Sequence, residues 1–161
     1  MTLSNRGDLR SPPRASVAVI GGGPAGLMAA EALAAGGAQV ELFDAMPSVG
    51  RKFLLAGRGG LNLTHSEPLE PFLDRYAGAR DALSPAVRAF DPSGLRDWAL
   101  ALGIETFVGT SGRVFPRDLK AAPLLRAWLH RLRAAGLQLH TRHRWFGWSD
   151  DGALRLHSPV G

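Results

Sequence analysis

A glycine-rich turn constrains this chain more than any other feature. The apolar segment 16–20 runs into the pattern Gly-x-Gly-x-x-Gly at Gly21, Gly23 and Gly26, and an alanine-rich helical segment follows. In a strand–turn–helix unit, the first glycine permits the sharp turn, the second lets a diphosphate approach the backbone, and the third lets the helix lie close to the strand. The free N–H groups and the positive dipole end of the helix face the phosphates. The turn therefore predicts a site for the diphosphate of a dinucleotide.

The residues that follow fit the same unit. A helix is expected from Pro24 to Ala35, because proline is tolerated at the first helical position and Gly36-Gly37 provides a C-terminal stop. A second strand, 39–43, leads into Asp44. An acid at the end of this strand, about 20 residues beyond the turn, is placed to accept hydrogen bonds from ribose hydroxyls. We therefore predict a Rossmann-type α/β domain, with a parallel sheet covered by helices on both faces.

The composition narrows the classes of function. The 161 residues suffice for about one domain with a hydrophobic core, and 45% of them are hydrophobic. The absence of cysteine excludes disulfides, a thiol nucleophile and a thiolate metal site. Much of the formal net charge of +5 comes from arginines between 117 and 144. We interpret them as a solvated helix face rather than a nucleic-acid surface, because no aromatic residues alternate with them in a stacking pattern.

The first residues have the composition of a disordered leader. Residues 1–14 contain three arginines and a Ser-Pro-Pro sequence, but no apolar stretch of the kind that a signal peptide needs. No segment of the sequence reaches the roughly 18 apolar residues of a membrane span. We therefore expect a cytoplasmic protein without a membrane partner, whose domain covers residues 15–161.

A cationic, glycine-containing loop is predicted after the second strand. Residues 50–60 contain Arg51, Lys52 and Arg58, together with four glycines and no acid. A loop of this kind, just beyond the acidic strand end, lies where a second phosphate-bearing part of a ligand would pass. His65 follows this loop and is more typical of a solvated loop histidine than of a catalytic acid or base. The sequence therefore indicates no catalytic residue.

The rest of the chain predicts further helices and strands. Short helices are expected within 66–90, and Asp91-Pro92 begins a clearer helix that ends at Gly103. The later elements are expected to be strands over 104–108 and 113–115, a helix over 119–135, a strand over 137–141, and strands over 144–148 and 153–157 that begin an antiparallel meander. His140 and His143 are three residues apart in an extended segment and should face opposite sides, so we expect no metal site.

Several of these segments resemble the bacterial flavoproteins of the YhiN/BaiN-like group, the aminoacetone-oxidase-like FAD-binding enzymes. The resemblance covers about residues 15–157. It implies a glutathione-reductase-like Rossmann domain that binds FAD non-covalently, and it leaves NAD(P)H open as the electron donor. The segments that carry it are Val17 to Gly26, Asp44, Gly50-Arg51-Lys52 through Asn62-Leu63-Thr64, and Gly112-Arg113-Val114-Phe115-Pro116 with Lys120-Ala121.

The resemblance also implies where the cofactor would lie. The glycine turn would hold the diphosphate, Asp44 would accept from the adenosine ribose, and Arg51 and Lys52 would lie over the adenosine diphosphate. The segment 59–62 would lie nearer the ribityl chain and the flavin, and Trp145 would offer a backbone contact near the adenine. The cofactor-binding set is thus Gly21, Gly23, Pro24, Ala25, Gly26, Asp44, Arg51, Lys52, Gly59, Gly60 and Asn62.

The chain departs from the family pattern in two respects. Many relatives carry Gly-Gly-Gly-Arg-Cys-Asn in the loop, whereas this chain reads Gly57-Arg58-Gly59-Gly60-Leu61-Asn62, so no thiol chemistry is implied. Family members are also more than twice as long, and this sequence ends at Gly161 without a further strand for the sheet. We therefore expect an incomplete domain, a fragment whose flavin side lacks later segments.

The sequence thus predicts the FAD-binding part of a flavin-dependent oxidoreductase with a small-molecule substrate. One alternative is an NAD-dependent dehydrogenase domain, because Asp44 permits NAD and disfavours a 2′-phosphate; the cationic loop 50–60 favours FAD. Another alternative is a non-catalytic fragment or a basic nucleic-acid-binding module, which would bind DNA or RNA in a salt-sensitive manner. The substrate, the electron acceptor and the oligomeric state do not follow from the sequence.

Overall fold

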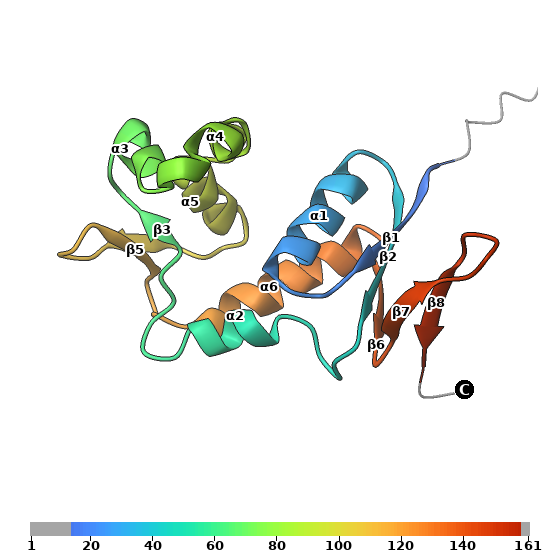
Figure 1. Ribbon diagram of the computed structural model, residues 1–161. Helices are drawn as coiled ribbons and strands as arrows, with labels where there is room; N and C mark the ends of the chain where they lie inside the picture. The colour runs from blue at the N-terminus through green and yellow to red at the C-terminus, as the bar shows by residue number, and fades with distance from the viewer. Residues whose placement is uncertain (1–13, 159–161) are drawn as a thin grey trace, which may run out of the picture.

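The computed structural model describes residues 14–158, so the predicted leader lies outside the described residues except for Arg14. Two parts can be followed in Figure 1: an α/β unit that contains the glycine turn, and a lobe of short helices and strands. In chain order the elements are β1 (Ser16–Ile20), α1 (Pro24–Ala35), β2 (Gln39–Asp44), α2 (Arg51–Ala56), β3 (Thr64–His65), α3 (Leu69–Asp74), η1 (Ala77–Ala79), α4 (Arg80–Ala89), α5 (Pro92–Ala101), β4 (Thr106–Val108), β5 (Arg113–Pro116), α6 (Ala121–Ala134), β6 (Gln138–Thr141), β7 (Arg144–Trp148) and β8 (Leu154–His157).

The α/β unit is built on a parallel sheet. β2 lies between β1 and β6 and pairs with both in parallel. Val40 and Leu42 of β2 are 2% and 0% exposed and belong to the core, which they share with α1 and α6. Because successive side chains of a strand point to opposite faces, the intervening Glu41 and Phe43 point to the other side of the sheet. The predicted strand–helix–strand unit and the α/β class are confirmed.

The second face of the sheet differs from the expectation of helices on both faces. In the described part of the chain, α1 and α6 lie on one side of the sheet, and the hairpin of β7 and β8 lies on the other (Figure 1). Ala18 and Ile20 of β1 are exposed on the hairpin side, Ile20 to 43%. An apolar strand residue does not reveal by itself whether anything covers it, so the sequence pattern could not distinguish these two arrangements.

Helix α6 supplies the largest share of the core that faces the sheet. Its start at Ala121 places Pro123 in the first turn, where a missing N–H costs little. The basic side chains at Arg126, His130 and Arg133 are exposed, as the predicted solvated helix face requires. Its buried residues are Ala121, Leu124, Leu125, Trp128 and Leu132. Among residues 14–158, no helix combines the length and the apolar character needed to cross a membrane.

A single carboxylate connects three helices. Oε2 of Glu31, on α1, accepts hydrogen bonds from Nε1 of Trp98 on α5 at 3.1 Å and from Nε1 of Trp128 on α6 at 2.6 Å. Oε1 of Glu31 pairs with the guanidinium of Arg131 at 2.6 Å. The two indole rings also pack edge to face, with centroids 4.8 Å apart. Glu31 therefore fixes α5 and α6 against α1 by directed polar contacts that a purely apolar core would lack.

The second lobe contains an antiparallel sheet in the order β3–β5–β4, with α3, α4 and α5 beside it. Leu73 and Val114 are fully buried within it. Asp91 caps α5 as predicted, because its Oδ1 accepts from the backbone N–H of Gly94 at 2.7 Å. The chain passes from this lobe into α6 through residues 117–120. Helix α5 of this lobe also contacts α1 and α6 of the α/β unit through Glu31.

Residues 51–56 form α2, where we predict a loop. Gly50 has φ 70°, a left-handed conformation that glycine adopts readily, and a Cβ there would lie 2.6 Å from the Leu125 side chain. The intervening Arg-Lys-Phe-Leu-Leu-Ala sequence favours a helix, and Gly57 ends it. The loop prediction is wrong: the two glycines mark the ends of a helix, and the residues between them favour that helix.

The predicted separation of His140 and His143 is also wrong. Their rings lie 5.5 Å apart between centroids, and both contact Phe43 of β2. Arg142 has φ 61°, so the chain turns between β6 and β7 and the strand alternation does not continue through it. His140 Nε2 also lies 2.9 Å from a carboxylate oxygen of Glu41.

We predict that Glu31→Ala lowers the free energy of unfolding by about 3 kcal/mol, because it leaves two indole N–H groups and a half-buried guanidinium without their acceptor. Glu105→Ala is the matched control: it removes an exposed pair with Arg117 and should cost less than about 1 kcal/mol. Urea unfolding followed by tryptophan fluorescence measures both. Equal losses in the two variants would contradict the role of Glu31.

Candidate functional site

The glycine turn between β1 and α1 has the geometry that its sequence predicts. Gly21 has φ 103°, and its N–H donates to the carbonyl of Phe43 at 2.8 Å, which joins the turn to the end of β2. A Cβ on Gly26 would lie 1.8 Å from the carbonyl oxygen of Gly21, so only glycine permits this approach of helix and turn. A Cβ on Gly23 would meet nothing within 4 Å. The turn therefore has open space at the glycine that was predicted to face a diphosphate.

Gly22, which lies between the first two glycines of the motif, connects the parts of the candidate site, and the sequence reasoning did not single it out. The N–H of Gly22 donates to Oδ2 of Asp44 at 2.6 Å, and its carbonyl accepts from the N–H of Gly50 at 2.7 Å. A Cβ on Gly22 would lie 2.3 Å from a methyl group of Val49 and 2.8 Å from Oδ2 of Asp44. The signal was present, since the first variable position of the motif is itself a glycine.

Asp44 lies at the end of β2, where the sequence predicts it, but it has a structural task as well. Besides accepting from Gly22, it accepts at Oδ1 from the N–H of Met46 at 2.7 Å. Each carboxylate oxygen has two lone-pair sites, so the side chain retains acceptor capacity. Asp44 thus links the glycine turn to the segment after β2 and can still accept from a ligand hydroxyl.

The connection between β6 and β7 supports the same segment from the other side. The N–H of Arg142 donates to the carbonyl of Met46 at 3.0 Å, and the N–H of His143 donates to the carbonyl of Asp44 at 2.9 Å. These two hydrogen bonds join backbone atoms only, so no sequence motif predicts them. They fix the segment 44–46 between the sheet and the site.

A cavity of about 440 Å³ lies beside the turn and the start of α2. Arg51 and Lys52, both exposed, give it positive charge, and Asp44 gives it one carboxylate. The structure thus brings together residues from three predicted groups: the turn, the acid and the cationic segment. Its lining residues are Gly22, Gly23, Asp44, Met46, Ser48, Gly50, Arg51, Lys52 and Leu55.

A second cavity, of about 500 Å³, lies on the other side of Lys52 and is lined mainly by apolar side chains. Pro24 at the first position of α1 and Asn62 also border it, so it begins beside the glycine turn. Lys52 borders both cavities. The lining residues are Pro24, Met28, Lys52, Phe53, Ala56, Leu61, Asn62, Leu63, Leu95, Trp98 and Trp128.

Some of the predicted site residues lie apart from these cavities. Gly59 and Gly60 follow α2 with positive φ values of 82° and 125°, and neither is among the residues that line the two cavities. Trp145 lies on β7 and is 40% exposed. His65 lies in β3, where Nε2 contacts the carbonyl of Ser111 at 3.0 Å and Nδ1 accepts from the N–H of Glu67.

The described residues show no cluster of three or more His, Asp or Glu side chains suited to a metal ion. The site's chemical groups are therefore backbone N–H groups at the start of α1, two basic side chains, one carboxylate and an apolar cavity. This set can hold a diphosphate flanked by a hydroxylated group on one side and by a flat apolar group on the other.

Three solved structures are similar to this chain at low sequence identity. A 3-ketosteroid-Δ4-(5α)-dehydrogenase from Rhodococcus jostii RHA1 is 14% identical, covers 97% of this chain and 44% of its own, and has a TM-score of 0.55. THI4 of Thermovibrio ammonificans is 19% identical, the match covers 89% of this chain and 45% of that protein, and the TM-score is 0.49. Glycine oxidase of Bacillus cereus ATCC 14579 is 16% identical, the match covers 85% of this chain and 50% of that protein, and the TM-score is 0.49. The similarity to the dehydrogenase shows that the fold is shared.

The matches cover only part of the solved proteins. The chain spans half or less of the length of each of these three proteins. The model of the family described as HI0933-like protein Rossmann domain matches residues 15–159, which is nearly the whole chain and includes the turn, both cavities and the second lobe. The chain therefore belongs to the HI0933-like Rossmann-domain family.

Proposed function

We propose that this chain is the FAD-binding part of a flavin-dependent oxidoreductase. The observation that carries the proposal is the pair of cavities that share Lys52 beside the start of α1: Asp44 and Arg51 also line one of them, and mainly apolar side chains line the other. FAD has the matching order of parts: an adenosine, a diphosphate and an isoalloxazine. The family match supports the same cofactor.

The diphosphate fits the turn. The N–H groups of Ala25 and Gly26 lie in the first turn of α1, where no intrahelical acceptor exists, and the first intrahelical bond reaches Gly23 from Leu27. The open space at Gly23 lets phosphate oxygens reach these donors, and the helix dipole favours their negative charge. Pro24 has no N–H to leave without a partner.

The adenosine belongs on the Asp44 side. The carboxylate of Asp44 is held in place by Gly22 and Met46, and its remaining lone pairs are available to the ribose hydroxyls. Arg51 and Lys52 border the same cavity and supply positive charge for the phosphates. This arrangement also disfavours a 2′-phosphate on the ribose, because the carboxylate would repel it.

The isoalloxazine belongs in the apolar cavity. FAD supplies the hydride or electron chemistry when it is bound. The chain's own contributions there are apolar walls that exclude water, the Lys52 ammonium and the Asn62 amide at the border. Gly59 and Gly60 do not line the cavity; their positive φ values direct the chain so that Asn62 reaches its border.

The finer assignments belong to this proposal as well. The YhiN/BaiN-like group is supported by the Gly50–Lys52 and Gly112–Pro116 segments. A small-molecule substrate, a bacterial origin and a cytoplasmic location follow from that group. The second candidate is an NAD-binding domain, which Asp44 permits; the apolar cavity beside the turn favours FAD over it.

A binding experiment on the purified full chain tests the cofactor. A yellow protein with flavin absorbance, or saturable binding of added FAD without comparable binding of NADH, supports the proposal. A colourless protein that ignores FAD and is stabilised by NADH would overturn it. Fluorescence of FAD and thermal denaturation with each nucleotide give independent readouts.

Gly23→Ala separates binding from folding. The added methyl group enters free space at an ordinary φ of −78°, so the midpoint of thermal denaturation without FAD should not change. The same methyl group would lie in the path of the diphosphate, so we expect FAD affinity to fall more than about tenfold. Gly26→Ala is the contrasting variant and should destabilise the protein itself, because its Cβ would overlap the Gly21 carbonyl. Unchanged FAD affinity in Gly23→Ala would argue against a diphosphate at this turn.

Asp44→Ala should weaken FAD binding by more than about tenfold, because it removes the ribose acceptor and the support of the turn. Asp44→Asn keeps an oxygen acceptor for the N–H of Gly22, so the loss of FAD affinity in this variant reports the ribose contact more directly. Glu41→Ala changes the same strand on the opposite face and should leave the affinity unaltered. FAD titration monitors all three, and an unaltered affinity in Asp44→Ala would remove Asp44 from the ribose role.

A further inference from the structure

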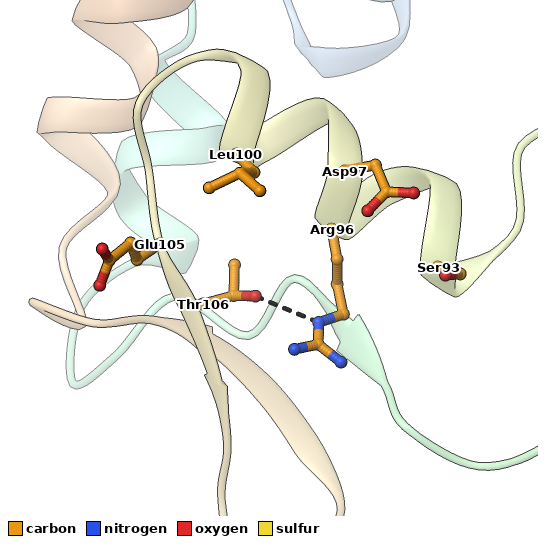
Figure 2. Close-up of a pocket in the computed structure, with 6 residues that line it drawn as sticks. All are labelled: Ser93, Arg96, Asp97, Leu100, Glu105 and Thr106. Carbon is orange, nitrogen blue, oxygen red and sulfur yellow. Dashed lines mark hydrogen bonds between the residues drawn. The ribbon is translucent and has the colours of Figure 1, made fainter.

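A third cavity lies in the second lobe, away from the proposed cofactor site. It measures about 520 Å³ and is formed between α5 and the segment that enters β4. Helix α5 separates it from the apolar cavity, because Leu95 and Trp98 line that cavity whereas other residues of the same helix line this one. Figure 2 shows the lining residues, which are Ser93, Arg96, Asp97, Leu100, Glu105 and Thr106.

The cavity contains the guanidinium of Arg96, which a hydrogen bond to Thr106 holds in position. Nε of Arg96 donates to the hydroxyl of Thr106 at 3.1 Å, which directs the half-buried side chain from α5 towards β4 (Figure 2). Within residues 14–158, the two terminal amino groups of Arg96 have no hydrogen-bond or ion-pair partner. A guanidinium held at one edge presents its other donors as a fork that suits a carboxylate.

The two acidic residues of the cavity are not equivalent. Glu105 forms an ion pair with Arg117 and points away from Arg96 (Figure 2). Asp97 follows Arg96 on α5, and in the described range its carboxylate has neither an ion pair nor a hydrogen bond. The cavity therefore offers one available cation and one available anion, a combination that favours a ligand carrying both charges.

An apolar side chain completes the set. Leu100 is 60% exposed and lies on the same side of α5 as Arg96 and Asp97 (Figure 2). An exposed leucine by itself needs no explanation, but beside a free guanidinium and a free carboxylate it offers a contact for an aliphatic group. Ser93 and Thr106 add two hydroxyl groups at the rim.

We propose that this cavity binds a free α-amino acid with an aliphatic side chain. Arg96 holds the carboxylate, Asp97 accepts from the ammonium group, and Leu100 contacts the side chain. The site is distinct from the FAD site and does not depend on it. A zwitterion satisfies both charged residues at once, whereas a simple carboxylate would meet the repulsion of Asp97.

Titration of the full chain with L-leucine, followed by calorimetry and by backbone amide NMR shifts, tests the proposal. We expect saturable binding with shifts concentrated in α5 and β4. Two analogues keep the carboxylate and remove the ammonium charge: 4-methylpentanoate lacks the amino group, and N-acetyl-L-leucine carries a neutral amide in its place. Both should bind at least about tenfold more weakly than leucine.

Variants assign the contacts. Arg96→Gln should weaken leucine binding about tenfold or more, while Arg126→Gln on the exposed face of α6 should leave it unchanged. In Asp97→Asn, the preference for leucine over 4-methylpentanoate should disappear. Asp44→Ala should bind leucine normally, which keeps this test independent of the cofactor. Absence of saturable binding, equal binding of either analogue to the unaltered protein, or unaltered binding in Arg96→Gln overturns the proposal.

Discussion

The hydrogen bond from the N–H of Gly22 to the carboxylate of Asp44 is the contact on which the candidate site depends. It joins the turn after β1 to the end of β2, and the return bond from Gly50 to the carbonyl of Gly22 joins the start of α2 to the same residue. Turn, acid and cationic helix are thereby fixed around one residue, Gly22. A ligand that contacts all three meets a preformed surface, which lowers the entropy lost on binding.

The Glu31 carboxylate has the corresponding role in the body of the protein. It receives both indole N–H groups and the Arg131 guanidinium, so α1, α5 and α6 have a defined relative placement. This placement shapes two cavities at once. Trp98 and Trp128 line the apolar cavity of the proposed flavin site, and the opposite side of α5 lines the cavity around Arg96. Helix α5 is thus a wall shared by both proposed sites.

The sequence predicts a local element correctly where a few neighbouring residues decide the backbone conformation. The glycine turn, the cap at Asp91 and the amphipathic face of α6 follow from residue type and spacing, because each is decided within a few residues. The Arg51–Ala56 helix was missed for the opposite reason: flanking glycines indicate a loop, but Gly50 uses its left-handed conformation to start a helix against Leu125. His140 and His143 were misplaced because the turn at Arg142 breaks the strand alternation.

The sequence by itself determined the class of fold and the kind of ligand, since glycine spacing and an acid at a strand end encode a dinucleotide-binding turn. Tertiary structure alone decided that Gly22 connects the turn to Asp44 and Gly50, that Asp44 also supports the segment after β2, and that Lys52 borders two cavities. It also decided that Arg96 faces Thr106 and that its remaining donors have no partner among residues 14–158. These features join residues that are far apart in the chain through backbone atoms or packing, and no local pattern of residue types records such contacts.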